Sequence, residues 1–391
     1  MITTRDALNN LLALVEPTSI EHIALDDAAG RVLAEPMAAR RAQPPFAASA
    51  MDGYAISSVK AAPGDRFKLI GEAAAGHAFQ GSIGAGETVR IFTGAPVPSG
   101  GARVIIQEDV TRTGNEIKLN DALDQGLHIR PAGGDFDIGS ALSAPRALSP
   151  AQVALLASMN CPKIPVYKKP VVAIIATGDE LTMPGEEPRA DQIIASNSFG
   201  LAAMFRTWGA EVRMLPISKD TLGSLTMAFE LAQSADLVVT IGGASVGDHD
   251  IVALAAQDLG LERTFYKVAM RPGKPLMAGR LNQSVMVGLP GNPVSSMVCA
   301  EIFIQPMLDK MRGLPAGPPP RVSAQLAHDI DQNGPREHYM RAQIQTDGQV
   351  TVFGRQDSSL MTVLADANAL VVRAPHAPAA TRGEKVEIIH I

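Results

Sequence analysis

The chain opens with the hydrophobic spacing of one amphipathic helix. Apolar residues recur there at three- and four-residue intervals: Ala7, Leu8, Leu11, Leu12 and Val15. Residues at this spacing share one face of a helix, so the pattern predicts a helix that packs by one side. Thr3 and Asp6 have the spacing of a capping box at its start, and Pro17 ends it.

A different pattern, of brief apolar runs, follows between Ala47 and Pro145. The runs that favour β-strands are Phe67–Ile70, Thr88–Thr93, Arg103–Glu108 and Glu116–Leu119. Clusters of Gly, Pro and Asp separate them, which is typical of a small β domain. Ser149 is then followed by Pro150 and Gln152, an N-cap signature that predicts a helix through about Ser158.

Strand and helix patterns alternate after Pro170. The predicted strands are Val171–Ala176, Glu211–Pro216, Leu237–Ile241, Phe265–Ala269 and Val285–Gly288. The predicted helices are Asn197–Trp208, Thr221–Gln233, one from about Ile251 and one from Pro293. Apolar strands that alternate with helices predict a parallel sheet covered on both faces, in an α/β domain over about residues 168–312.

The proline-rich stretch Gly313–Pro320 predicts an extended linker, because successive prolines cannot continue a helix. Short runs follow it at Met340–Gln345, Val350–Phe353, Ala369–Val372 and Val386–Ile389. These runs favour a second small β domain, a barrel or a sandwich, at the C-terminal end.

Composition narrows the class of protein. The 391 residues are enough for two to four domains, and 46% hydrophobic with 19% charged residues is typical of a soluble globular protein. A net charge of -6 gives no general reason to bind nucleic acid or a membrane surface. The two cysteines, Cys161 and Cys299, form no metal-binding motif, and no apolar run is long enough to span a bilayer. We therefore expect a cytoplasmic protein.

Candidate chemistry appears in three glycine-containing loops, each of which follows an apolar run. The loops lie within Thr240–Asp250, Met270–Pro275 and Gly288–Ser296. Beyond the carboxyl ends of strands in an open α/β sheet, such loops bring backbone N–H groups to an anionic ligand. Ordinary turns also need Gly and Asn, but three such loops together indicate a site for a phosphorylated molecule.

Carboxylates stand beside two of the predicted strand ends. Asp179 and Glu180 follow the first strand of the α/β domain, and Ser245, Asp248 and Asp250 follow a later one. Mg²⁺ prefers one or two carboxylates together with phosphate oxygens and water, which suits Glu180 and Asp250 as metal ligands. The alternative is that these acids cap helix N-termini.

Seven motifs, in order along nearly the whole chain, resemble those of the molybdopterin molybdenumtransferases, called MoeA in bacteria. The first two are Pro44–Phe46 continuing through Ser49–Ala55 (SAMDGYA), and Thr93–Pro98 (TGAPVP). The others are Thr177–Leu181 (TGDEL), Ser196–Ser198 (SNS), Gly242–Gly247 (GGASVG) with Asp250, Arg271–Pro275 (RPGKP) and Pro290–Ser295 (PGNPVS).

The resemblance implies an elongated multidomain fold of α/β and β type. Domain I, a discontinuous linker domain, would comprise residues 26–46 and 146–167, and domain II, a β domain, residues 47–145. Domain III, a doubly wound α/β molybdopterin-binding domain, would comprise residues 1–25 and 168–312. Domain IV would be a β-barrel-like domain over residues 319–391.

The resemblance also implies a reaction in molybdenum cofactor biosynthesis. Molybdate would be inserted into adenylylated molybdopterin, with Mg²⁺-dependent release of AMP. Residues that match the family's catalytic positions are Glu180, Asp250, Asp52, Thr93, Asp135 and Lys267. Residues that match its ligand-binding positions are Thr177, Gly242, Gly243, Ser245, Asp248, Asp220, Arg271, Lys274, Pro275, Gly291, Asn292, Ser295, Arg341 and Ser358.

Within that set, Lys267, Arg271, Lys274 and Ser295 would line an anion pocket for molybdate. The implied assembly is a homodimer in which the β domain of one subunit reaches the α/β domain of the other. Further partners would be a molybdopterin adenylyltransferase and proteins that mature molybdoenzymes.

Some positions depart from the family pattern. Ala47 and Ala48 replace a common Asp-Asn pair, Ala195 replaces a common Asp, and Arg271 replaces a common Lys. Arginine keeps the positive charge, so that change is mild.

Two other functions remain as alternatives. The first is a molybdopterin adenylyltransferase, which the α/β domain alone resembles. The second is a non-catalytic molybdopterin carrier or scaffold. The β domains argue against the first, and the retained Glu180, Asp250, Lys267 and Lys274 argue against the second.

Overall fold

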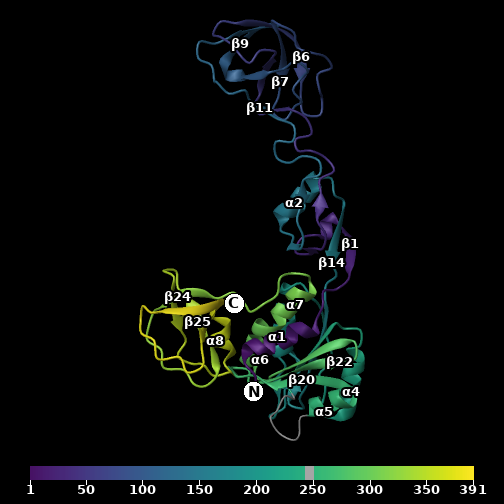
Figure 1. Cartoon of the computed structure of the whole chain (residues 1–391), viewed down its shortest axis with the longest axis vertical. Coiled ribbons are helices and arrows are strands. Elements are labelled where there is room, and N and C mark those ends of the chain that lie inside the picture. The colour runs from purple at the N-terminus through teal and green to yellow at the C-terminus, as the bar shows by residue number, and fades with distance from the viewer. Residues whose placement is uncertain (243–250) are drawn as a thin grey trace. The chain divides into compact units, whose positions relative to one another are not determined.

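The computed structural model describes residues 1–242 and 251–391, which divide into two compact units (Figure 1). One unit comprises Met1–Glu21, Gly30–Ala34 and Val166–Ile391. The other comprises His22–Ala29 and Glu35–Pro165. No helix in the described ranges is long and apolar enough to cross a membrane.

The smaller unit is built mainly from β-strands. Its central sheet has the order β8-β5-β7-β6-β10-β9: Arg103–Ile106, Gly53–Ile56, Glu87–Ile91, Arg66–Ala73, Glu116–Leu119 and Val110–Thr113. Two-stranded sheets pair β11 (Ile129–Arg130) with β4 (Ala48–Ser49), and β12 (Ala141–Leu142) with β3 (Met37–Ala38). Helix α2 (Pro150–Ser158) has the predicted capping box of Ser149 and Gln152. The short runs recognised in the sequence therefore do form a β domain.

A further four-stranded sheet has the order β1-β14-β2-β13. Its strands are Ile20–Ala24, Lys163–Tyr167, Val32–Leu33 and Arg146–Ala147.

The larger unit contains a doubly wound α/β sheet of order β18-β15-β19-β23-β22-β20. Its strands are Glu211–Met214, Val171–Ala176, Leu237–Ile241, Ser284–Leu289, Pro275–Leu281 and Leu261–Lys267. The helices are α1 (Thr4–Leu14), α3 (Asn197–Thr207), α4 (Leu222–Leu231), α5 (Ile251–Asp258), α6 (Pro293–Cys299) and α7 (Gln305–Met311). A π-helical stretch, η3 (Ala300–Ile304), joins α6 to α7.

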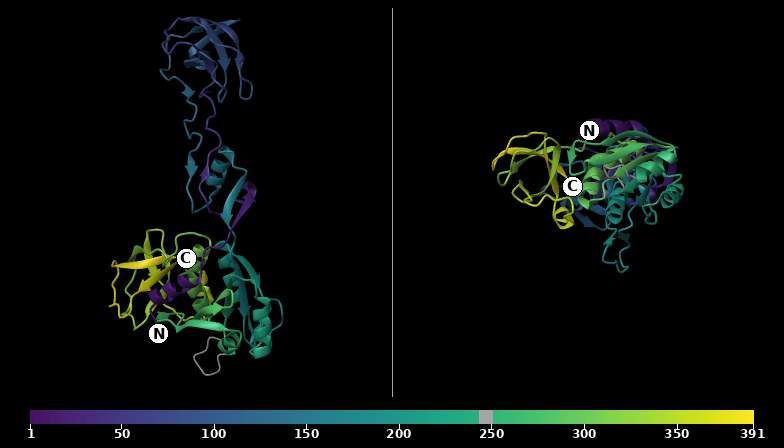
Figure 2. Two further views of the ribbon diagram at one scale, coloured as in Figure 1. Left: turned by 45° about the vertical axis from the view of Figure 1, so that its right-hand side comes forward. Right: turned by 90° about the horizontal axis from the view of Figure 1, so that it is seen from below.

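Both faces of this sheet are buried, as the continuous apolar strands predicted. Val172 and Ile174 of β15 pack into the core that contains α1, α3, α6 and α7. The alternate residues Ala173 and Ile175 pack with α4 and α5. Because successive side chains point to opposite faces, one strand supplies both cores. Figure 2 shows helices on the two sides of the sheet.

One edge of the sheet differs from the expected parallel arrangement. Strand β22 pairs antiparallel with β23, and β20 pairs antiparallel with β22. The only parallel pairs among the described strands of this sheet are β15 with β18, β15 with β19, and β19 with β23. Strand β22 was not predicted, because its apolar residues follow directly after the glycine-containing loop at Gly273 and end just before Asn282.

The C-terminal β domain is a closed five-stranded barrel, which confirms the predicted barrel-like fold. Its strands are β24 (Val322–Leu326), β25 (Glu337–Ile344), β26 (Gln349–Val352), β27 (Ala369–Arg373) and β28 (Lys385–His390), with helix α8 (Met361–Ala365). They have the order β25-β26-β24-β28-β27, and a pairing between β27 and β25 closes the ring (Figure 2).

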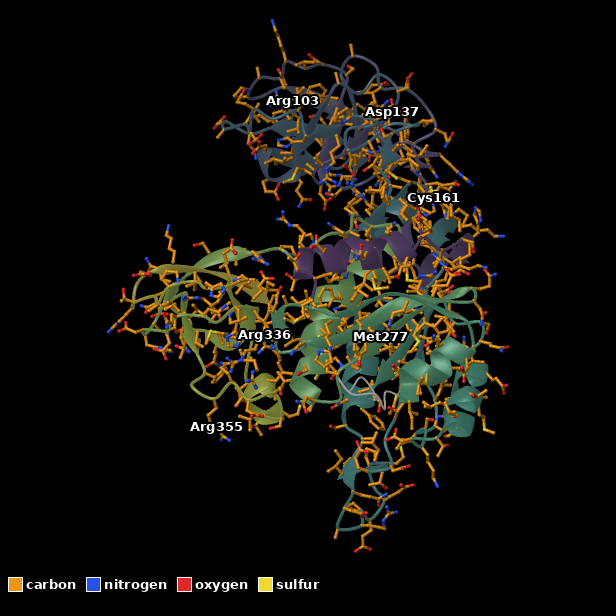
Figure 3. All side chains as sticks on the ribbon, turned by 60° about the horizontal axis from the view of Figure 1, so that its bottom comes forward. Arg103, Asp137, Cys161, Met277, Arg336 and Arg355 are labelled. Atoms are coloured by element: carbon orange, nitrogen blue, oxygen red, sulfur yellow. The ribbon has the colours of Figure 1, made fainter. Side chains whose placement is uncertain are left out.

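The barrel and the α/β domain are joined through the backbone. Strand β21 (Met270–Arg271) extends from the α/β domain and pairs parallel with Glu337 and His338 of β25. Nearby, Arg336 donates a hydrogen bond from Nη1 to the Met270 carbonyl at 3.2 Å, and Figure 3 shows this arginine between the two domains. Thr4 of α1 hydrogen-bonds the Glu337 carboxylate. These hydrogen bonds hold the barrel against the α/β domain within the larger unit.

Candidate active site at the carboxyl ends of the parallel strands

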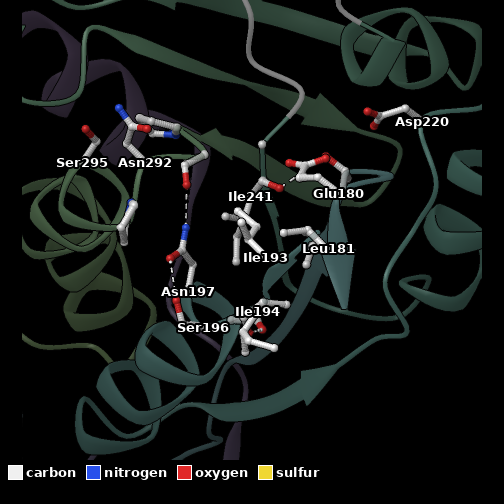
Figure 4. Close-up of a pocket in the computed structure, with 18 of the residues that line it drawn as sticks. Glu180, Leu181, Ile193, Ile194, Ser196, Asn197, Asp220, Ile241, Asn292 and Ser295 are labelled. Atoms are coloured by element: carbon white, nitrogen blue, oxygen red, sulfur yellow. Dashed lines mark hydrogen bonds between the residues drawn. The ribbon is translucent and has the colours of Figure 1, made fainter. Parts of the chain in front are cut away.

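A pocket of about 620 Å³ lies where three neighbouring parallel strands end (Figure 4). Ala176 ends β15, Ile241 ends β19, and Pro290 follows β23, and all three line the pocket. Open α/β sheets bind ligands at this edge, because the loops that leave the strands converge there.

Backbone hydrogen bonds hold the strand ends in register. The Thr177 N–H donates to the Ile241 carbonyl at 3.0 Å, and the Gly242 N–H donates to the Leu289 carbonyl at 3.2 Å. Gly242 has a φ of +89°, and a Cβ there would lie 2.8 Å from the Thr177 carbonyl oxygen. The position therefore requires glycine both for its conformation and for space.

A second wall comes from the starts of α3 and α6. The Asn197 side-chain amide donates from Nδ2 to the Gly291 carbonyl at 2.7 Å, as drawn in Figure 4. Asn292 donates from Nδ2 to Ser358 Oγ at 2.8 Å, so the barrel contributes to this side of the pocket. The Val294 N–H also donates to the Ser358 carbonyl, at 3.1 Å.

The opposite side of the pocket is acidic. Burial raises the pKa of Asp220, and the neighbouring carboxylates of Asp179 and Glu180 raise it further. The negative charges of these carboxylates repel one another, and a bound cation would reduce that repulsion. Among the described residues, no three acidic, histidine or cysteine side chains form a ready-made metal cluster.

Many of the residues predicted from the sequence do meet in this pocket. They are Thr177, Glu180, Asp220, Gly242, Pro275, Gly291, Asn292 and Ser295. Four others lie outside the described residues: Gly243, Ser245, Asp248 and Asp250. The Glu180–Asp250 metal pair therefore stays a prediction.

The predicted cationic residues lie elsewhere. Lys267, Arg271 and Lys274 are not among the described residues that line the pocket. Lys267 places its Nζ 5.3 Å from the centre of the Tyr266 ring. Arg271 lines a different cavity, of about 590 Å³, with His338 of the barrel. Lys274 is exposed, close in sequence to Pro275 of the pocket wall.

Arg341 is a buried residue of β25, with 1% of its surface exposed. An arginine in a strand pattern predicts a surface residue when the family resemblance is set aside, and for Arg341 that prediction is wrong. Its Nε donates to Gln356 Oε1 at 3.3 Å, and its Nη1 donates to the Leu360 carbonyl at 3.3 Å. Arg341 therefore holds the segment from Gln356 to Leu360, which contains Ser358, the residue that contacts Asn292.

In the β-rich unit, Asp52 and Thr93 form a local pair. Asp52 Oδ1 accepts hydrogen bonds from the Thr93 N–H and the Thr93 hydroxyl, both at 2.7 Å. The backbone bond from Thr93, and then its hydroxyl, lower the pKa of Asp52. The exposed Asp135 donates its backbone N–H to the Gln43 carbonyl at 2.9 Å.

Sequence reasoning missed several residues of the wall. Ile193 and Ile194 line it although they are exposed, and Ser196, Asn197 and Ser198 open α3 beside it. The Ser-Asn-Ser motif was a usable signal, because it stands just before a predicted helix. The two isoleucines form β17 (Ile193–Ile194), which pairs with β16 (Leu181–Thr182). The loop of residues 183–192 separates the two strands, so the local sequence pattern does not predict that the isoleucines reach the pocket.

Family comparisons agree with this architecture. Residues 2–160 match the MoeA N-terminal region (domain I and II), 173–310 a probable molybdopterin binding domain, and 323–391 the MoeA C-terminal region (domain IV). The molybdopterin molybdenumtransferase of Nostoc sp. is 33% identical over 95% of this chain and 90% of its own length. The enzyme of the same name from Haemophilus influenzae is 33% identical over 99% of this chain and 98% of its own.

A solved structure shows the same fold. The molybdopterin biosynthesis MoeA protein from Pyrococcus horikoshii superposes with a TM-score of 0.85 at 28% identity, over 100% of this chain and 99% of that one. With relatives of this identity along almost its whole length, the chain belongs to the MoeA family of molybdopterin molybdenumtransferases, which are transferases of molybdenum cofactor biosynthesis.

Proposed function

We propose that this chain inserts molybdate into adenylylated molybdopterin and releases AMP, giving molybdenum cofactor. The observation that carries the proposal is the pocket at the ends of β15, β19 and β23. Eight residues that the family resemblance assigns to ligand binding or catalysis come together there. Their types suit a phosphorylated ligand, because hydroxyl, amide and backbone groups surround one open space.

In this proposal the pterin and its pyrophosphate occupy the pocket between Thr177 and Asn292. Thr177, Asn292 and Ser295 offer polar groups along that wall, and Gly242 lets the ligand approach the backbone. Lys274, which is exposed next to Pro275 of the wall, supplies positive charge for molybdate. Arg271 lies on the same loop, but its side chain lines the cavity that contains His338. Holding molybdate beside the dithiolene sulfurs of the pterin removes much of the entropic part of the barrier.

A divalent cation fits the acidic side. Burial first, and then the negative charges of Asp179 and Glu180, raise the pKa of Asp220, so three carboxyl groups lie close enough to interact there. We assign Glu180 and Asp250 as the ligands that would hold Mg²⁺, since both offer hard oxygen atoms. Mg²⁺ bound there would withdraw charge from the pyrophosphate and make AMP a better leaving group.

We further propose that the working unit is a cytoplasmic homodimer with a composite active site. Asp52 and Thr93 of one subunit would face Glu180 and Asp250 of the other. The support is the Asp52–Thr93 pair, which fixes a carboxylate on the β-rich unit with a lowered pKa. A two-fold axis would create both composite sites at once.

The test is a reaction with adenylylated molybdopterin, Mg²⁺ and limiting molybdate. AMP should appear in step with molybdate, and Glu180→Gln should slow its release roughly a hundredfold. Glu187→Gln is the matched control, because Glu187 is an exposed carboxylate between β16 and β17 that does not line the pocket. Binding of the pterin without AMP release would indicate a carrier. In a separate reaction with molybdopterin and ATP, release of pyrophosphate would indicate an adenylyltransferase.

A further inference from the structure

A second cavity, of about 600 Å³, lies between the α/β domain and the barrel, within the larger unit. We call it the Trp208 cavity after the only tryptophan of the chain. Its apolar wall combines Met204 and Trp208 from the region of α3, Met297 of α6, and Leu364 and Leu370 of the barrel domain. It shares no residue with the pocket at the strand ends.

Among the described residues of this wall, Glu301 alone has an acidic side chain. It lies on the π-helical stretch Ala300–Ile304, and such stretches are often found at functional sites. Its carboxylate makes no hydrogen bond or ion pair with any residue that the structure describes. Burial raises the pKa of Glu301 to about 7.

Glu301 is half-buried, and a carboxylate that faces a largely apolar cavity without a protein partner is less favourable in its charged form than one in open water. A cation in the cavity would supply the missing partner. Trp208 would add attraction, because the face of an indole ring is electron-rich and binds cations. The two methionines would pack against the apolar part of the same ligand, since thioethers adapt to irregular shapes.

We propose that the Trp208 cavity binds a small organic cation with an apolar body, such as an arylalkyl ammonium ion. The ammonium group lies against Glu301, and the apolar body lies against Trp208, Met204 and Met297. The cavity volume is in the range of about 300 to 1,000 Å³ that small-molecule sites occupy. This site is independent of the proposed reaction.

The test uses the fluorescence of Trp208, which reports on the cavity alone because the chain has no other tryptophan. The full-length protein is titrated with 4-phenylbutylamine and with the neutral analogue 4-phenylbutanol. The amine should give a saturable change and bind roughly ten- to a hundredfold more tightly than the alcohol, as expected for a charge-assisted hydrogen bond. Calorimetry with Trp208→Phe should still detect binding of the amine.

The preference for the amine should depend on Glu301. Glu301→Gln should remove it, and lowering the pH from about 8 to about 6 should weaken it, because the amine stays charged while the carboxylate gains a proton. The other titratable side chain among the described residues of the wall is His390. His390→Ala should leave the preference for the amine in place.

Three results would overturn the proposal: equal binding of amine and alcohol, a preference that survives in Glu301→Gln, or no saturable change at millimolar amine. If Glu301→Gln folds poorly, the comparison of amine and alcohol on the unaltered protein still tests whether the cavity prefers a cation.

Discussion

At the residue scale, Gly242 shows how the candidate site constrains the chain. Gly242→Ala should destabilise the fold by about 1 to 3 kcal/mol, because the residue would keep a left-handed conformation and press on the Thr177 carbonyl. Activity should fall with it, since the change displaces the ends of β15 and β19. Thermal unfolding and AMP release measure the two effects.

Gly348→Ala is the matched control for that prediction. Gly348 has a φ of +83°, but no atom lies within 4 Å of where its Cβ would be. It should therefore show only the conformational cost, with full activity. If both variants lose activity equally, the contact with Thr177 is not what matters.

His338 provides a prediction of pH dependence. Burial, and after it the positive charges of Arg271, Arg336, Arg341 and Arg373, together lower its pKa to about 4. The unfolded chain takes up the proton first, so the stability that the neutral ring contributes is complete above pH 6.5 and is lost as the pH falls through 4.

Denaturant unfolding of the parent and of His338→Gln at several pH values tests this point. The parent should lose more stability than the variant between pH 6.5 and pH 4. Parallel curves would show that His338 is not the group responsible.

The sequence identified the chemistry of the site residues better than their positions. Thr177 and Gly242 directly follow predicted strands, and Glu180 lies four residues beyond the first of them. They could be found because parallel strand ends meet at one edge. The placement of Arg271 beside His338 could not be found, because it depends on how the barrel packs against the α/β domain. Local patterns hold no information about that contact.

At the element scale, periodicity predicted most helices and strands of the α/β domain. Helix α3 was expected at Asn197–Trp208 and spans Asn197–Thr207. The direction of β20 and β22 was not predictable, because the spacing of apolar residues along a strand is the same whichever way its neighbour runs. Closure of the barrel was equally hidden, since it depends on pairing between strands far apart in the chain.

Helix α1 offers a test at this scale. Leu11 is fully buried in the core that α1 shares with α7 and β22. Leu11→Ala should therefore reduce the free energy of unfolding by about 2 to 5 kcal/mol. Asn9→Ala, on the exposed face of the same helix, should stay within about 0.5 kcal/mol of the parent. Equal effects in chemical denaturation would mean that α1 does not dock as described.

At the scale of the whole molecule, the proposed composite site can be tested by mixing inactive chains. Asp52→Ala and Glu180→Ala should each be nearly inactive. Because half of the dimers in an exchanged mixture are mixed and each keeps one intact site, activity should return to about a quarter of the parental level.

Differently tagged chains verify the exchange by co-purification. A mixture that exchanges subunits and stays as inactive as its parents would place the whole site within one chain. Two Asp52→Ala chains with different tags serve as the control and should recover nothing.

The pairing of β21 with β25 should hold the barrel to the α/β domain even when the linker between them is cut. The barrel is connected to the rest of the chain through the stretch Gly313–Pro320, yet backbone bonds at Met270 and Arg271, and the contact of Asn292 with Ser358, also hold it. A protease that cuts only within that stretch should therefore yield two fragments that migrate together until denatured. The linker connects the barrel to the α/β domain covalently, and the strand pairing holds the two together without it.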